Sequence, residues 1–142
     1  MISAHLPVLQ VVVPLVAAPL IVLLRRGLVG YVLAMAASAF VAGSALSLLA
    51  DVWHGGVISY AIGNWPPPWG IEYRIDAANA FVLALLGVIA VVVAAYARRS
   101  VAAEVPAEQH YLFYAMYCLC LAGLVGITVT GDAFNVFVFL EI

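Results

Sequence analysis

The sequence predicts an all-α polytopic membrane protein with four complete transmembrane helices and the start of a fifth. Hydrophobic residues make up 68% of the 142 residues and charged residues only 8%, whereas about a quarter of a soluble domain is charged. Four apolar segments are each long enough to cross a hydrocarbon layer about 30 Å thick. A fifth apolar segment begins after Gly131 and Asp132.

The positions of the spans follow from uncharged apolar segments that are bounded by polar residues. We expect a single membrane domain over residues 1–142, with spans at about 6–24, 28–50, 77–97 and 111–130, the start of a fifth at 133–142, and a loop at 51–75. The first run is a retained span and not a cleavable signal peptide, because Arg25 and Arg26 follow it instead of preceding it. Gln10, the polar side chain within that run, is interpreted as an interhelical hydrogen-bonding group and not as a transport ligand.

Small residues in the second span predict close helix packing. Two sets recur at four-residue steps, and such stripes let a neighbouring helix approach closely. The sets are Ala34, Ser38 and Ala42, and Gly43 and Ser47.

The loop at 51–75 predicts a short hairpin that caps the helix ends. Val57–Ile62 and Ile71–Ile75 can pair as strands around a turn rich in glycine and proline. The loop also carries aromatic side chains of the kind enriched at membrane interfaces. They are Trp53, Tyr60, Trp65, Trp69 and Tyr73.

The arginines predict the orientation. The loops after the first and third spans carry Arg25, Arg26, Arg98 and Arg99, and the other side carries Arg74. Because cytoplasmic loops are enriched in basic residues, we expect the Arg25/Arg26 and Arg98/Arg99 loops in the cytoplasm. The N-terminus and the 51–75 loop then face outward.

Glu141 is the candidate functional residue. Asp132 predicts a helix start, and Glu141 lies nine residues later, which is about 14 Å of helix and therefore near the middle of the membrane. Hydrocarbon disfavours the charged form of a carboxyl group, so we hypothesise that an acid at this depth takes up and releases protons. The alternative is a structural role in an ion pair or an interhelical hydrogen bond. The other six acids lie in loops or at span borders.

Other chemistry finds little support in the sequence. Cys118 and Cys120 would point about 200° apart on a helix, and the three histidines lie at span borders, so we expect no metal site, no haem and no other cofactor. There is no nucleophile–base pattern and no basic nucleic-acid footprint. We therefore expect neither an enzyme nor a nucleic-acid partner. The ten residues from Ala133 to Ile142 cover about half a bilayer, so we also expect the sequence to be part of a longer protein.

Two segments resemble a known family. TGDAFNVFVFLEI (Thr130–Ile142) resembles the fifth-helix motif of antiporter-like membrane proteins, namely the D subunit of multisubunit (Mrp-type) sodium/proton antiporters and the large membrane subunits of respiratory complex I. VISYAIGNWPPPWGIEYRID is similar to the family's region before its third helix. The Asn-x-Phe-Val-Phe-x-Glu form favours the antiporter branch of the family.

The resemblance implies a fold and a role. It implies the N-terminal third of a fold of about 14 helices built on inverted repeats, in the inner membrane of a bacterial cell. It implies a subunit of a multisubunit sodium/proton antiporter, with Glu141 handling protons and monovalent cations, and with the other subunits and the lipid bilayer as partners. The alternatives are a proton-pumping membrane subunit of a complex I-like or other redox-driven complex, and a structural or assembly subunit.

Overall fold

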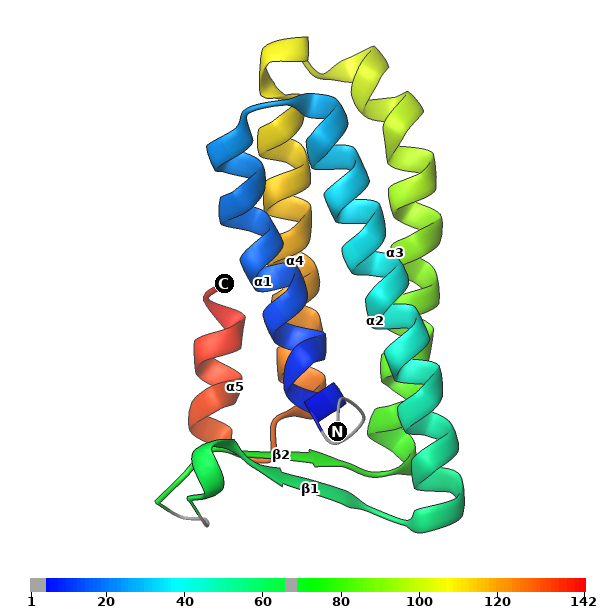
Figure 1. Ribbon diagram of the computed structural model, residues 1–142, viewed down its shortest axis with the longest axis vertical. Coiled ribbons are helices and arrows are strands. Elements are labelled where there is room, and N and C mark those ends of the chain that lie inside the picture. The colour runs from blue at the N-terminus through cyan, green and yellow to red at the C-terminus, as the bar shows by residue number, and fades with distance from the viewer. Residues whose placement is uncertain (1–4, 66–68) are drawn as a thin grey trace.

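Four long antiparallel helices form a bundle in the computed structural model, which describes residues 5–65 and 69–142 (Figure 1). They are α1 (Leu6–Leu24), α2 (Gly27–Gly55), α3 (Ala77–Glu104) and α4 (His110–Val129). All four are long and apolar enough to cross a membrane. A fifth helix, α5 (Ala133–Leu140), follows, so the predicted fold class is confirmed.

The helices pack through small apolar side chains. α2 packs along α3, and α1 packs along α4 and α2, while α5 rests on α4. The apolar core forms one cluster around Val41, Leu83 and Val125 and another around Ile21 and Cys118. The first cluster consists mainly of valine, alanine and leucine and the second mainly of alanine, so the helices approach closely with few large side chains between them.

Two helices continue past the apolar segments that predict them. The sequence places the second and third spans at 28–50 and 77–97, whereas α2 ends at Gly55 and α3 at Glu104. A charged residue ends an apolar run but does not end a helix, because each backbone N–H still bonds the carbonyl four residues earlier. In the last turn of α3, Ser100 Oγ donates to Glu104 Oε1 at 3.0 Å.

The small residues of α2 are only partly placed as predicted. Ala34 and Ser38 are fully buried, and the backbone of Ala42 lies so close to Gly87 of α3 that a Cβ on Gly87 would come within 2.6 Å of Ala42 Cα. The second predicted set contacts no helix among the described residues. Gly43 and Ser47 are exposed, and a Cβ on Gly43 would meet no atom within 4 Å among the described residues.

A two-stranded antiparallel sheet crosses one end of the bundle (Figure 1). It consists of β1 (Ile58–Ala61) and β2 (Glu72–Ile75), with Ile58 opposite Ile75 and Tyr60 opposite Tyr73. The predicted hairpin is therefore present, and a short 3-10 turn (Ile62–Asn64) follows β1. The predicted proline turn at Pro66–Pro68 lies outside the described residues.

The hairpin is part of the core as well as a cap. Ile75 is fully buried and Tyr73 is 5% exposed, so Tyr73 lies in the hairpin at the end of the bundle but faces the core. The alternation of a β-strand turns these two side chains toward the helices. Trp53, Trp65 and Trp69 are exposed, as interfacial side chains would be.

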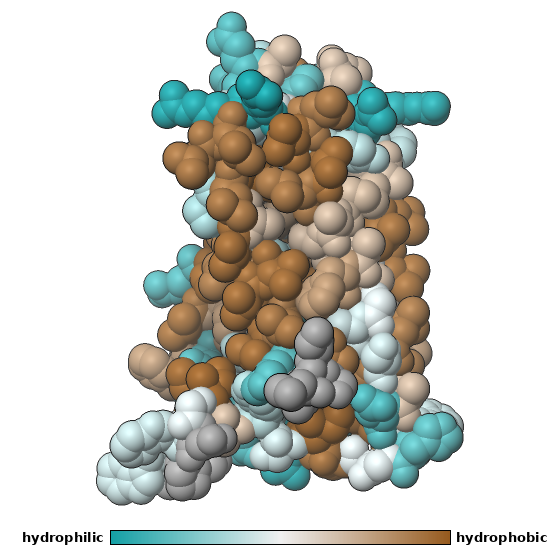
Figure 2. Space-filling model, viewed as in Figure 1, coloured by the Kyte–Doolittle hydropathy of each residue, from teal (hydrophilic) through white to brown (hydrophobic). Residues whose placement is uncertain are grey.

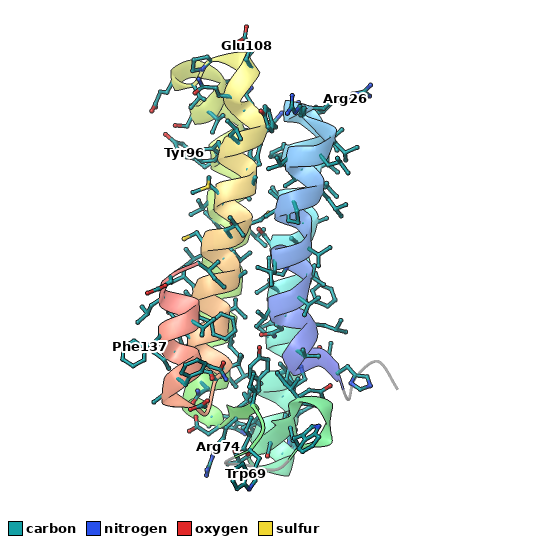
Figure 3. The ribbon with its side chains drawn as sticks, turned by 90° about the vertical axis from the view of Figure 1, so that its left-hand side faces the viewer. Arg26, Trp69, Arg74, Tyr96, Glu108 and Phe137 are labelled. Carbon is teal, nitrogen blue, oxygen red and sulfur yellow. The ribbon has the colours of Figure 1, made fainter. Side chains whose placement is uncertain are left out.

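Polar side chains gather at both ends of the molecule. Figure 2 shows a mostly apolar band between two hydrophilic ends. Arg26 lies at one end, and Arg74 and Trp69 lie at the hairpin end (Figure 3). The Arg98 guanidinium stacks over the ring of Tyr31 in the first turns of α2, with 5.3 Å between its Cζ and the ring centroid. Arg25, Arg26, Arg98 and Arg99 therefore share one end, called the arginine end below.

Candidate functional site

The site begins with the capped start of α5. Asp132 has an extended backbone, and its Oδ1 accepts a hydrogen bond from the N–H of Phe134 at 3.1 Å. Its Oδ2 lies 3.5 Å from Nδ2 of Asn135, which is 5% exposed. A carboxylate at this position satisfies unpaired amides and complements the helix dipole. The predicted cap is thus present. Asn135 is a buried polar residue that was not predicted, although its spacing three residues after the cap could have pointed to it.

The hairpin holds the connection between α4 and α5. The N–H of Gly131 donates to the carbonyl of Glu72 at 2.9 Å, and Thr130 forms a β-bridge with Tyr73. A Cβ on Gly131 would lie 3.2 Å from Cβ of Arg74, so the close approach favours glycine. The direction in which α5 leaves the connection is therefore set by a strand that lies more than 50 residues earlier in the chain.

The end of α4 is held from a second side. Asn79, in the first turn of α3, donates from Nδ2 to the carbonyl of Thr128 at 2.6 Å. The N–H of the same residue bonds Oδ1 of Asp76 at 2.9 Å, so the cap of α3 and the end of α4 are linked through one residue. The sequence predicts Asp76 as this cap, and the structure confirms it.

α5 lies in a seat formed by two glycines of α4. A Cβ on Gly126 would collide with the ring of Phe139, and a Cβ on Gly123 would lie 3.0 Å from the Phe139 carbonyl oxygen. The absence of side chains at these positions allows the backbones to approach closely, as small residues do in membrane helix pairs. Phe137 points away from α4 and is 69% exposed (Figure 3).

Glu141 follows the last turn of α5. Its N–H donates to the carbonyl of Val138 at 3.3 Å, and its side chain is exposed. No hydrogen bond or ion pair joins its carboxylate to any residue that the structure describes. Figure 1 shows the C-terminus about halfway along the bundle, so the adjoining Glu141 lies beside the apolar middle and not at either polar end.

The other acids lie toward the ends of the bundle. Asp76 and Asp132 cap helices, and Glu72 belongs to the hairpin. Asp51 lies in the last turns of α2, Glu104 ends α3, and Glu108 lies in the short turn Ala107–Gln109 that precedes α4. Glu141 therefore differs from the other six acids in its depth along the bundle.

Two histidines make hydrogen bonds to neighbouring segments, and the two cysteines lie apart. His5 Nδ1 lies 2.8 Å from the hydroxyl of Tyr60, and His110 Nε2 lies 2.8 Å from the carbonyl of Val105. Cys118 is buried and Cys120 is exposed, so the two thiols do not converge. Within residues 5–65 and 69–142, no group of three or more histidine, cysteine or acidic side chains could hold a metal ion.

The prediction for Gln10 is wrong. The sequence predicts an interhelical hydrogen bond, but neither Oε1 nor Nε2 has a partner among the described residues. The side chain is nonetheless fully buried. A sequence can place a polar residue within a span, but the presence of a partner depends on which side chains the neighbouring helices present.

Comparison with known proteins gives relatives of two kinds, although no family model matches. The N subunit of NADH-quinone oxidoreductase from Desulforudis audaxviator is 41% identical over an alignment of 144 positions, which covers 99% of this chain and 28% of that protein. The D subunit of the Na⁺/H⁺ antiporter from Alkalihalophilus pseudofirmus is 35% identical over 67% of this chain and 19% of that protein. The chain thus spans less than a third of the length of either relative.

A solved structure shares the fold. A chain of the Mrp complex from Dietzia sp. DQ12-45-1b superposes with a TM-score of 0.84 and 28% identity, over 99% of this chain and 26% of that chain. The same four-helix bundle and fifth helix thus occur within a larger membrane protein. The chain belongs to the family of antiporter-like membrane proteins that includes the D subunits of Na⁺/H⁺ antiporters and the N subunit of NADH-quinone oxidoreductase.

Proposed function

We propose that this chain forms part of the proton and monovalent-cation path of a multisubunit sodium/proton antiporter, and that Glu141 takes up and releases the proton. The observation that supports the proposal best is the depth of Glu141 beside the apolar middle of the bundle. A carboxyl group at such a depth is costly to keep charged, so a functional role is the default explanation for it. The relatives named as antiporter D subunits support the transport role.

The proposed chemistry is a proton exchange governed by charge. In its neutral form, the Glu141 carboxyl group carries the proton; on release, the remaining carboxylate needs a nearby cation. The chain has no lysine, and its five arginines lie near the two ends of the bundle. We therefore assign the stabilising cation to a basic residue outside this chain or to the exchanged metal ion.

The seat of α5 supports this role. Exchange requires a carboxyl group held at a constant depth, so that a partner can approach and leave it. The Asp132 cap, the Gly131–Glu72 hydrogen bond and the glycine seat on α4 fix the start and the last turn of α5. They leave the side chain of Glu141 exposed.

Substitution of Glu141 tests the proposal. In everted vesicles containing the assembled complex, Glu141→Gln should abolish the collapse of a pH gradient on addition of Na⁺, K⁺ or Li⁺, while the amount of assembled complex stays the same. Glu108→Gln, an acid at the arginine end, is the matched control and should exchange normally. Full exchange by the Glu141→Gln protein would refute the assigned role.

A second function is favoured by the relative of 41% identity: a proton-pumping subunit of a redox-driven complex. The two functions differ in what drives ion movement. An antiporter exchanges cations in vesicles energised only by a pH gradient, whereas a redox-driven pump moves protons only while electrons flow. Measurement of exchange with and without an electron donor distinguishes them.

We also propose the orientation and the membrane. The arginine end faces the cytoplasm of a bacterial cell, and the N-terminus and hairpin face outward, because basic residues are retained on the cytoplasmic side. Trp69 is 84% exposed at the hairpin end. Trp69→Cys should react with a membrane-impermeant maleimide in intact cells, and Arg26→Cys should react only after permeabilisation. The reverse pattern would overturn this orientation.

A further inference from the structure

Gln10 is an exception among the buried polar side chains. Ser38 and Ser44, also buried, donate to carbonyls of their own helix, to Ala34 at 2.8 Å and to Phe40 at 2.7 Å. Gln10 is 0% exposed, yet its amide oxygen and its amide nitrogen both lack partners among the described residues. Because buried polar atoms are almost always hydrogen-bonded, such a group calls for a partner other than the described side chains.

A second polar group on the same residue has lost its usual donor. Pro14 has no N–H, so the carbonyl of Gln10 lacks the hydrogen bond that residue 14 would otherwise donate within α1. Pro14 is itself fully buried, so this carbonyl lies on the packed side of α1. Within membranes, the groups freed by proline are satisfied by neighbouring side chains or by ordered water.

Gln10 lies one turn from the start of α1 and is packed against the apolar core. Gln10 lies 14 residues from the end of α1, and Val41 lies 14 residues from the start of α2, which is about 21 Å along each helix from the turn that joins them. Val41 and Val11, the neighbour of Gln10, belong to the same buried cluster. Since Gln10 is fully covered, a large partner could reach it only by separating the helices.

We propose that the Gln10 side chain, together with the backbone carbonyl that Pro14 deprives of a donor, binds one or two ordered water molecules inside the bundle. Water donates to the amide oxygen and the carbonyl and accepts from the amide nitrogen, so it satisfies all three groups. A monovalent cation would satisfy the two oxygens but would leave the amide nitrogen unpartnered. The site is independent of Glu141 and of the direction of ion movement.

Radiolytic hydroxyl-radical labelling tests the site, because bound water generates radicals next to residues that bulk solvent does not reach. The membrane-embedded protein, with the subunits that co-purify with it, is irradiated in lipid nanodiscs and analysed by mass spectrometry. Val11 and Val101 are matched probes, since each is a buried valine that is 3% exposed. Val11 should be labelled clearly more than Val101, and Gln10→Leu should reduce its labelling to the level of Val101.

Three results would overturn the proposal. The first is equal labelling of Val11 and Val101 in the unmodified protein. The second is a rise in Tm of the Gln10→Leu protein, because replacing an unsatisfied buried amide with an apolar side chain of similar size is stabilising. The third is a rise in Tm with Na⁺ that Gln10→Leu abolishes, which would assign the site to a cation. If Gln10→Leu does not fold, Pro14→Ala restores the missing N–H and should lower the labelling of Val11.

Discussion

The ring of Phe139 in α5 occupies the space beside Gly126 of α4 that any larger side chain at position 126 would need. This contact holds the last turns of α5 against α4. It lies two residues before Glu141, so it also determines where the candidate proton-handling group lies. A change at Gly126 therefore acts on the site without altering any titratable group.

Gly126→Ala should displace α5. The added methyl group collides with the Phe139 ring, and overpacking of this kind costs about 1–3 kcal/mol. Thermal unfolding should show a lower Tm, and hydrogen–deuterium exchange should be faster in α5. Gly43→Ala is the matched control, because its methyl group meets no described atom within 4 Å and alanine is the better helix former by about 1 kcal/mol. Equal behaviour of the two variants would contradict the proposed seat.

Gly87→Ala should destabilise the bundle more than Gly126→Ala. Its Cβ would come within 2.6 Å of Ala42 Cα, which is backbone, whereas the ring of Phe139 can rotate away. The helices α2 and α3 would have to separate, at a cost of about 3 kcal/mol or more. Comparison of the two unfolding temperatures checks the order, and the opposite order would show that the α2–α3 contact is looser than the structure indicates.

Asp132→Ala should loosen α5 while leaving the four long helices intact. Removal of the cap costs about 1 kcal/mol, because the N–H of Phe134 loses its acceptor. That loss corresponds to roughly fivefold faster amide exchange in α5. Asp132→Asn retains an acceptor oxygen and should behave nearly as the unmodified protein. If both variants exchange equally fast, the charge of Asp132 matters more than the cap.

Stability should fall at alkaline pH because of Tyr73. Burial raises the pKa of the Tyr73 hydroxyl above its usual value of about 10. The folded state therefore favours the neutral form, and its stabilisation is fully present below pH 10 and is lost as the pH rises through the higher folded-state value. Tyr73→Phe should flatten the dependence of Tm on pH above 10. An unchanged slope would assign the effect to another tyrosine.

Several parts of the fold follow from local chemistry and are predictable from sequence. The predicted helix caps Asp76 and Asp132 both accept the expected backbone N–H. The residues Ile58–Ala61 and Glu72–Ile75 pair as the predicted hairpin. Such features depend on residues within a few positions of each other, or on alternation within a short segment, so a single sequence carries them.

The sequence does not show which face of an element is buried or which side chains meet there. Gly43 belongs to a predicted packing stripe but is exposed, Tyr73 lies in the hairpin but faces the core, and Gln10 has no described partner although the sequence predicts one. The transmembrane helices are apolar all round, so the sequence gives little indication of which side meets another helix and which meets lipid. Only the packed bundle separates the two.

By itself, the sequence determined that the chain enters a membrane, where its spans lie and that one acid, Glu141, follows an apolar helix. Those conclusions rest on the length of apolar runs and on the cost of charge in hydrocarbon, and neither depends on neighbouring helices. Tertiary structure decided that α5 rests on Gly123 and Gly126, that the hairpin holds its start, and that Gln10 is buried without a described partner. These are contacts between residues far apart in the chain, and close packing fixes them only once all the helices are in place.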